Sequence, residues 1–189
     1  MGIFRRGQDT HTLAIAMTGV GLGDRLLNVG CTDPSLIGAL SAKVGLSGRA
    51  CAIVASGEQA TLARRGAESA GALVEIETGS LDTFPFEDEA FTVAAIDNQA
   101  GLLSSMPAAT RAAMFRQVHR TLAPRGRVVI IERGTPTGLG ALFKSGAREP
   151  ADPNYASAGG ALGVLKAEGF RSARQLADRG GLSFFEAVR

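Results

Sequence analysis

The stretch Arg25-Leu-Leu-Asn-Val-Gly-Cys-Thr-Asp-Pro34 carries the signals of a strand, a tight turn and the start of a helix. The apolar run over 25–29 predicts the strand, and Gly30 opens the turn. Asp33 is a typical N-cap residue and Pro34 is favoured at the first helical position, so we expect a helix over 34–44. Strand, turn and helix in this order are typical of the first unit of an α/β domain.

The same alternation continues outward from this stretch to the end of the chain. Further strands are predicted over 50–54, 73–77, 91–96 and 127–131, helices over 56–71, 107–122 and 155–168, and a final hairpin over 170–176 and 182–188. Strands that alternate with helices form parallel sheets. We therefore expect an α/β fold with a doubly wound, mostly parallel seven-stranded sheet and one antiparallel strand near the C-terminus. Pro124-Arg-Gly126 predicts a turn before the fifth strand.

One domain over 1–189 is expected, because this length supports one complete core and no repeat or break in composition divides the chain. Within it, residues 1–22 are expected to form an N-terminal helical segment. The Gly- and Pro-rich segment 134–155 predicts a loop near the substrate side.

Composition narrows the class of function. With 20 Lys and Arg against 18 Asp and Glu, and basic residues that do not form a stripe, a nucleic-acid partner is not expected. The apolar stretch Leu13–Val20 is too short to span a bilayer, and the first residues lack the pattern of a signal peptide, so we expect a cytoplasmic protein without a membrane partner. Cys31 and Cys51 are expected to be buried, reduced thiols, with no metal site.

Two glycine-containing turns are candidates for a ligand-binding loop. Gly19-Val-Gly-Leu-Gly23 precedes a strand instead of following one, so we interpret it as a flexible turn. The turn Gly30–Asp33 has the right context, between a strand and a helix, although it contains a single glycine. Ligands of open α/β sheets bind at the carboxyl ends of the strands, so we expect the site at the ends of the first, second and fourth strands.

Four stretches resemble class I S-adenosylmethionine-dependent methyltransferases, and within them the small-molecule group that includes quinone-biosynthesis enzymes. These stretches are 23–31, 84–91 (Phe-Pro-Phe-Glu-Asp-Glu-Ala-Phe), 119–127 (His-Arg-Thr-Leu-Ala-Pro-Arg-Gly-Arg) and Gly169-Phe170 with the two strands that follow. The resemblance covers the chain from about Gly23 to Arg189. It implies a Rossmann-like methyltransferase fold, S-adenosylmethionine as cofactor and a small-molecule substrate.

The resemblance also implies the cofactor-binding positions of this chain. They are Asn28, Gly30, Cys31, Thr32, Asp33, Val54, Ser56, Ser80, Leu81 and Asp97. Asn28, Val54 and Ser80 depart from the family, which has acidic residues there. Because Val54 cannot accept the two ribose hydroxyls, the loss is about 3–6 kcal/mol, or roughly 10²- to 10⁴-fold in affinity.

Nearby polar residues have two interpretations each. Glu58 either replaces the lost ribose contact or complements the dipole of its helix as a first-turn acid, and we favour the second. Ser56 is equally well explained as the N-cap of that helix, with Gln59 completing a capping box. Asp33 either caps its helix, with a charge that opposes a carboxylate ligand, or attracts the cofactor's ammonium group.

The catalytic residues cannot be assigned from the sequence. Asp97 and Asn98 are candidates, because methyl transfer needs an oriented nucleophile and, for a hydroxyl, a general base; a polar strand end is the alternative. Glu132 and Arg133 at the end of the fifth strand are a second candidate pair, with an exposed ion pair as the alternative. Segments 1–12 and 134–153 are too short for an elaborate lid, so the pocket is either shallow or completed by a partner chain, as in a homodimer.

The sequence is consistent with two functions and argues against a third. The first is an S-adenosylmethionine-dependent methyltransferase acting on an unidentified small molecule. The alternative is a catalytically silent protein of the same fold, with weak or lost cofactor binding and a binding or regulatory role. A nicotinamide-dependent oxidoreductase fails the fingerprint, because the turn has one glycine and Val54 stands at the acidic position.

Overall fold

The computed structural model describes residues 3–133, 152 and 154–189. The helices are α1 (Ile3–Thr18), α2 (Pro34–Val44), α3 (Gly57–Ser69), α4 (Leu102–Ser105), α5 (Ala108–Thr121) and α6 (Gly160–Ala167). The strands are β1 (Arg25–Val29), β2 (Arg49–Val54), β3 (Glu75–Thr78), β4 (Phe91–Asn98), β5 (Leu122–Arg133), β6 (Arg171–Arg179) and β7 (Leu182–Val188). None of the helices in these described ranges combines the length and apolar composition needed to cross a bilayer.

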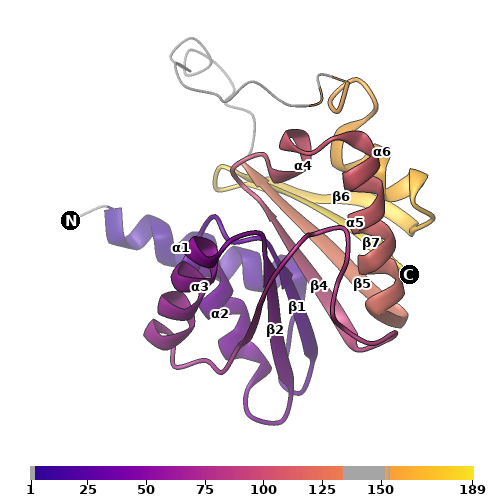
Figure 1. Cartoon of the computed structure of the whole chain (residues 1–189). Helices are drawn as coiled ribbons and strands as arrows, with labels where there is room; N and C mark the ends of the chain where they lie inside the picture. The colour runs from indigo at the N-terminus through magenta and orange to yellow at the C-terminus, as the bar shows by residue number, and fades with distance from the viewer. Residues whose placement is uncertain (1–2, 134–151, 153) are drawn as a thin grey trace.

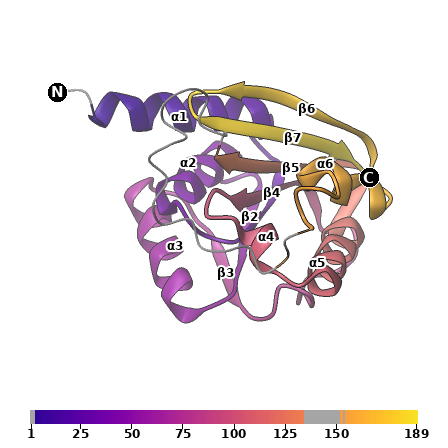
Figure 2. The ribbon, with the colours of Figure 1, turned by 90° about the horizontal axis from the view of Figure 1, so that it is seen from above.

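The strands form a seven-stranded sheet in the order β3-β2-β1-β4-β5-β7-β6 (Figures 1 and 2). β1 pairs in parallel with β2 and β4, and β4 with β5. β7 runs antiparallel to both of its neighbours, β5 and β6. The fold prediction is therefore confirmed, including the one antiparallel strand near the C-terminus. The carboxyl ends of β1, β2, β4 and β5 meet at one edge of the sheet, which is where such folds bind ligands.

Two apolar layers sandwich this sheet. Because neighbouring residues of a strand point to opposite faces, Leu26 and Val93 pack with α1 and α2, whereas Leu27 and Ala94 pack with α5 and α6. α3 lies beside α2 (Figure 2). The strand interiors are buried on both sides, as their unbroken apolar runs predict.

Local capping explains where α2 and α3 begin. The side chain of Asp33 accepts a hydrogen bond from the Ser35 amide at 3.0 Å, and Pro34 is the first residue of α2, as predicted. Ser56 caps α3 by accepting from the Gln59 amide at 3.2 Å. The Gln59 side chain in turn accepts from the amide of Ala55, one residue before the cap. Both helix starts therefore lie at the ligand edge of the sheet.

Several element boundaries differ from the sequence prediction. The expected turn at Pro124–Gly126 lies inside β5, where the β4–β5 register shifts between the pairs Phe91–Leu122 and Val93–Arg127, so the strand continues past a bulge. β3 begins two residues late, at Glu75. α6 begins at Gly160, not at 155, because Gly159 and Gly160 have positive φ and end the preceding turns. Most of the expected loop 134–155 lies outside the described residues.

Candidate cofactor and acceptor site

The turn after β1 is closed tightly against the end of β4. Gly30 has a φ of +79°, and a Cβ there would lie 3.0 Å from Leu102 Cδ2 and 3.4 Å from the Asp97 carbonyl oxygen. Its amide donates to the Ile53 carbonyl at 2.9 Å. The one glycine of the turn thus stands at the position where both the backbone angle and the close packing require it.

The carboxylate of Asp97 holds this turn from the neighbouring strand. Asp97 is 4% exposed, and its Oδ2 accepts from the backbone amides of Thr32 at 2.6 Å and Asp33 at 3.0 Å. Its Oδ1 accepts from the Gln99 amide at 3.2 Å. Charge-assisted hydrogen bonds of this kind are about twice as strong as neutral ones. Asp97 therefore fixes the turn, and it already accepts from two amides that a ligand carboxylate could otherwise meet.

Helix α1 contributes a histidine to the same turn. His11 Nε2 lies 2.9 Å from Asp33 Oδ2, while Oδ1 of the same carboxylate caps α2. Both side chains are partly exposed, 22% for His11 and 34% for Asp33. The charge of Asp33 is thus shared between the helix cap and an imidazole from a segment 22 residues earlier.

The end of β2 is apolar where the family has a ribose-binding carboxylate. Val54 is 0% exposed and packs in one cluster with Cys31 and Ile37. Burial, together with the charges of Asp97 and Asp33, raises the pKa of Cys31 to about 11, so its thiol is neutral at physiological pH. The end of β2 and Cys31 therefore offer a ligand an apolar surface without a charged group.

Carboxylates lie close in sequence to Val54 and Ser80, the two positions where this chain lacks the family's acidic residues. Ser80, after β3, donates to Asp82 Oδ1 at 2.6 Å, and Leu81 between them is buried in the core. Glu58 is exposed in the first turn of α3. The carboxylates of Asp82 and Glu58 are therefore each within a few residues of the positions where the family has its acidic ligands.

Asn28 is turned away from the loop. Its side-chain amide is 2% exposed and donates to the Cys51 carbonyl at 3.2 Å and the Ser41 hydroxyl at 3.4 Å. These contacts hold β1 against β2 and α2. Asn28 therefore fixes β1 in the sheet, whereas the carboxylate of Asp97 binds the amides of the turn Gly30–Asp33.

A second polar cluster lies on the opposite face of the sheet. Asn98, next to Asp97, points to the α4 and α5 side because strand residues alternate. Its Nδ2 donates to Glu132 Oε1 at 2.6 Å, and its Oδ1 accepts from the Leu103 amide at 2.7 Å. The hydroxyl of Tyr155 donates to the same Glu132 oxygen at 3.0 Å. Asn98, Glu132 and Tyr155 form what we call the acceptor cluster.

A buried arginine supports the acceptor cluster. Arg111 is 6% exposed; its Nη1 donates to the carbonyls of Leu103 and Met106, and its Nη2 donates to Asp152 Oδ2 at 2.5 Å. The guanidinium also lies 4.9 Å from the centre of the Tyr155 ring. Burial and the nearby Glu132 carboxylate raise the pKa of Tyr155, so its hydroxyl remains a donor.

The structure brings part of the expected site together. Gly30–Asp33 and Asp97 are joined by hydrogen bonds, and Cys31 packs with Val54. Ser56 is the α3 cap, and Asn98 bonds Glu132 instead of the turn Gly30–Asp33. Glu132 does not form the alternative exposed pair with Arg133, because its carboxylate is bound to Asn98 and Tyr155.

Four residues of the site carry no sequence signal that we recognised. His11, Arg111, Asp152 and Tyr155 come from helix and loop positions without a motif. Tyr155 is the one tyrosine of the chain, which is the single feature that could have drawn attention to it.

Comparison with known proteins identifies the family. A family model described as a methyltransferase domain matches residues 26–126, more than half of the chain. The chain belongs to this methyltransferase-domain family. Membership of this family supports S-adenosylmethionine as the cofactor, as the resemblance implied, whereas the quinone-biosynthesis-like subgroup stays a prediction. A curated relative, an uncharacterized 37.1 kDa protein in transposon TN4556 of Streptomyces fradiae, is 34% identical over 110 residues. The match spans 58% of this chain and only 30% of that relative.

Solved structures share the fold at low sequence identity. A SAM-dependent methyltransferase from Aquifex aeolicus is 18% identical with a TM-score of 0.69, covering 94% of this chain and 88% of its own. Magnesium protoporphyrin IX methyltransferase from Synechocystis PCC 6803, solved with bound SAH, is 19% identical with a TM-score of 0.59, covering 97% and 84%. The [4+2]-cyclase SpnF is 19% identical with a TM-score of 0.63, covering 96% and 80%. The presence of a cyclase on this fold means that the reaction must be argued from the site.

Proposed function

We propose that this chain is an S-adenosylmethionine-dependent methyltransferase that acts on a small molecule. The observation that carries the proposal is the turn Gly30–Asp33, held by the Asp97 carboxylate at the carboxyl ends of β1 and β4. In an open α/β sheet this edge is the ligand site. Membership of the methyltransferase-domain family assigns the cofactor.

The residues present fit this cofactor, with fewer charged contacts than the family provides. The left-handed Gly30 places no side chain at the first position of the turn, and Cys31 with Val54 supplies an apolar surface. Glu58 and Asp82 are the carboxylates available for the ribose and the adenine amino group. Bound there, the cofactor supplies an electrophilic methyl group on its sulfonium sulfur.

The acceptor cluster is suited to orient and deprotonate a nucleophile. Oε1 of Glu132 accepts from both Asn98 and Tyr155, which fix the carboxylate, and among the described residues its Oε2 has no hydrogen bond. We propose that Oε2 takes the proton of the substrate hydroxyl or thiol as the new bond to carbon forms. Asn98 and Tyr155 are positioning residues, because they act through Glu132.

Calorimetric titration with S-adenosylmethionine, S-adenosylhomocysteine and NAD tests the cofactor. We expect saturable binding of the first two and none of NAD. Transfer of a tritiated methyl group into the low-molecular-mass filtrate of a cell extract then tests the activity. Binding without transfer would favour the silent alternative, and no binding by a folded chain would contradict the proposal. The cytoplasmic location and the homodimer stay predictions.

A further inference from the structure

A basic pocket lies at the edge of the sheet opposite the cofactor turn. It has a volume of about 440 Å³ and is lined by His119, Pro124, Arg125, Gly169, Arg171 and Arg189. The pairing registers place it: Phe91 opens β4 beside Leu122, and Val188 pairs with both Arg127 and Arg171. These residues lie at the amino ends of β4 and β5, so the pocket is separate from the site at their carboxyl ends.

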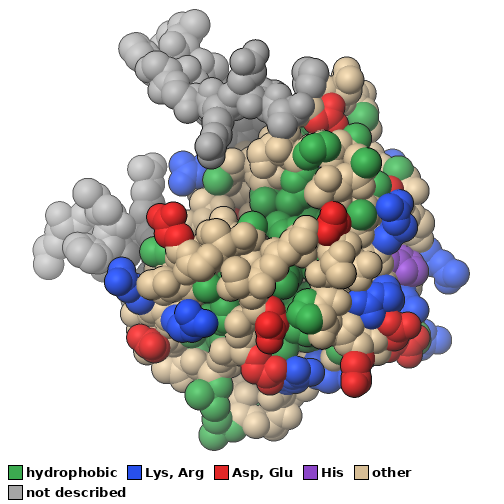
Figure 3. All heavy atoms as spheres, viewed as in Figure 1, with side chains coloured by type: hydrophobic (Ala, Val, Ile, Leu, Met, Phe, Trp, Pro, Cys, Tyr) green, Lys and Arg blue, Asp and Glu red, His purple; other side chains and the backbone are tan. Residues whose placement is uncertain are grey.

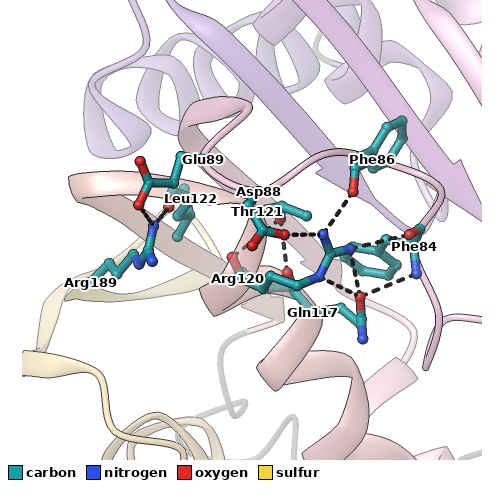
Figure 4. A network of polar contacts seen from close by, with 10 residues as sticks. Phe84, Phe86, Asp88, Glu89, Gln117, Arg120, Thr121, Leu122 and Arg189 are labelled. Carbon is teal, nitrogen blue, oxygen red and sulfur yellow. Dashed lines mark hydrogen bonds and ion pairs between the residues drawn. The ribbon is translucent and has the colours of Figure 1, made fainter.

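The positive charge of this pocket is largely uncompensated. Arg125 and Arg171 are exposed and have no ion-pair or hydrogen-bond partner within the described ranges. Arg189 keeps one partner, Glu89, at 3.1 Å, and its guanidinium also donates to the Leu122 carbonyl (Figure 4). On the face shown in Figure 3, Lys and Arg side chains gather around a histidine at the right-hand edge. Three guanidinium groups thus line the pocket, and one of them, that of Arg189, is paired with a carboxylate, that of Glu89.

His119 completes the pocket with a group that can donate a hydrogen bond. Its ring packs edge-on against Phe170, with centroids 5.1 Å apart. Burial, followed by the charges of Arg189 and Arg171, lowers the pKa of His119, so the ring is neutral at physiological pH. The other charged groups nearby are paired: Arg116 with Glu168, and Arg120 with Asp88. Burial is thus the main cause of the lowered pKa of His119, and the charges of Arg189 and Arg171 act in the same direction.

Backbone strain is concentrated at the same place. Among the described residues other than glycine, those with positive φ are Glu89, Arg125 and Ser172. Arg125 lines the pocket, Glu89 binds Arg189, and Ser172 follows Arg171. A left-handed backbone is unfavourable for such residues, and positions of this kind cluster at binding sites.

We propose that this pocket binds a phosphate group, carried either by inorganic phosphate or by a small phosphate ester. Guanidinium groups match the geometry of phosphate oxygens and bind them in pairs of hydrogen bonds. Arg125 and Arg171 supply the uncommitted cations, Arg189 adds to the field, and the His119 ring supplies a donor. Four groups around one pocket suit a single anion instead of a polymer, since the basic residues form no stripe.

NMR of the two histidine rings tests this site without any enzyme assay. A pH titration of the full chain in increasing inorganic phosphate, at constant ionic strength with chloride, follows His119, with His11 as internal reference. An anion in the pocket stabilises the protonated ring, so we expect a saturable rise in the pKa of His119 and none in that of His11. Methyl phosphate as a second ligand distinguishes the sources: equal affinity indicates an ester, and exclusion indicates free phosphate.

Variants locate the effect. The double variant Arg125→Gln/Arg171→Gln should bind phosphate at least about tenfold more weakly, and Arg64→Gln on α3, which removes an exposed charge elsewhere, should bind as the parent does. Circular dichroism checks that each variant is folded. An equal response to chloride, or equal affinity in the double variant and the control, would overturn the proposal. A short RNA that binds more tightly than phosphate, with a steep dependence on salt, would overturn it as well.

Discussion

The carboxylate of Asp97 accepts a hydrogen bond from the backbone amide of Thr32 at 2.6 Å, joining the end of β4 to the turn after β1. Asn28, the last residue but one of β1, bonds to β2 and α2 instead. The turn Gly30–Asp33 is therefore held by a side chain of the neighbouring strand β4. This relationship makes Asp97 the first residue to test.

Replacing Asp97 with Asn should loosen the turn. The variant keeps one acceptor oxygen but loses the charge that strengthens its contacts with Thr32 and Asp33, so we expect a loss of about 1–3 kcal/mol in the free energy of unfolding. Binding of S-adenosylhomocysteine should weaken as well. Urea unfolding and calorimetry measure both. Asp178→Asn, on exposed β6, is the matched control; an Asp97 variant as stable as this control would show that the turn does not depend on the carboxylate.

Restoring the family's carboxylates should strengthen cofactor binding. Val54→Asp places a charge in an apolar cluster, so it should lower the melting temperature of the free protein. Combined with Ser80→Asp, it should nevertheless bind S-adenosylhomocysteine more tightly than the parent chain, and the ligand should raise its melting temperature by more. Val54→Asn with Ser80→Asn is the uncharged control. No gain in the folded acidic variant would argue against this placement of the cofactor.

Features of the fold that depend on residues close together in the sequence could be predicted, whereas those that depend on distant segments could not. Strands, helices and caps follow from local patterns, so Asp33, Pro34 and Ser56 were placed correctly before the fold was known. The sheet order depends on pairings between distant segments, which periodicity does not encode. Pro124–Gly126 was interpreted as a turn because the same residues serve turns and bulges, and only pairing with β4 distinguishes the two.

The same distinction between local and distant contacts applies to the candidate site. The turn Gly30–Asp33 could be found because its context, between strand and helix, is local. The contact of Glu132 with Tyr155 spans 23 residues, and that of His11 with Asp33 spans 22, and neither has a motif. Such contacts arise from how helices pack on the sheet, so they become visible only in the folded chain.

Glu132→Gln should abolish proton transfer while leaving cofactor binding intact. If Glu132 is the general base, methyl transfer to a hydroxyl acceptor should fall by about 10²- to 10⁴-fold. Tyr155→Phe removes one donor to Glu132, so it should lower the rate less and shift the pH profile. Single-turnover assays at several pH values measure both effects. A Glu132 variant with an unchanged rate would remove this residue from the mechanism.

Arg111 should be important for stability. Arg111→Met leaves the carbonyls of Leu103 and Met106 without their donor and breaks the pair with Asp152, at a cost of about 3 kcal/mol or more. Chemical unfolding measures this loss. Arg116→Met, five residues further along α5 and on its exposed side, is the control. Similar stability of the two variants would contradict the structural role of Arg111.

The ion pair between Arg111 and Asp152 predicts that the stability of the fold depends on pH below about 4. The hydrogen bond from Arg111 holds the pKa of Asp152 below its ordinary value of 3.8. A carboxyl with a lowered pKa stabilises the fold above the unfolded-state value, and that contribution is lost as the pH falls from about 4 through the folded-state pKa. Asp152→Asn should therefore be less stable than the parent at neutral pH and should lose less stability on acidification. Parallel unfolding curves for both proteins below pH 4 would contradict this.

Asp33→Asn separates the cap of α2 from the charge at its start. The Asn oxygen can still accept from the Ser35 amide, and the lost pair with His11 is partly exposed, so the melting temperature should change little. Because a negative charge opposes the approach of a ligand carboxylate at a helix N-terminus, S-adenosylhomocysteine should bind about two- to fivefold more tightly. Calorimetry and thermal melting measure the two effects.

Two controls identify the cause of any change in Asp33→Asn. Glu68→Gln removes an exposed charge at the far end of α3, and His11→Gln removes the imidazole while keeping Asp33; neither should tighten binding. Weaker binding by Asp33→Asn at equal stability would mean that Asp33 contacts the cofactor's ammonium group. Binding that is the same in all four proteins would mean that this end of the sheet does not receive the amino-acid part of the cofactor, and would favour the silent alternative over the enzyme.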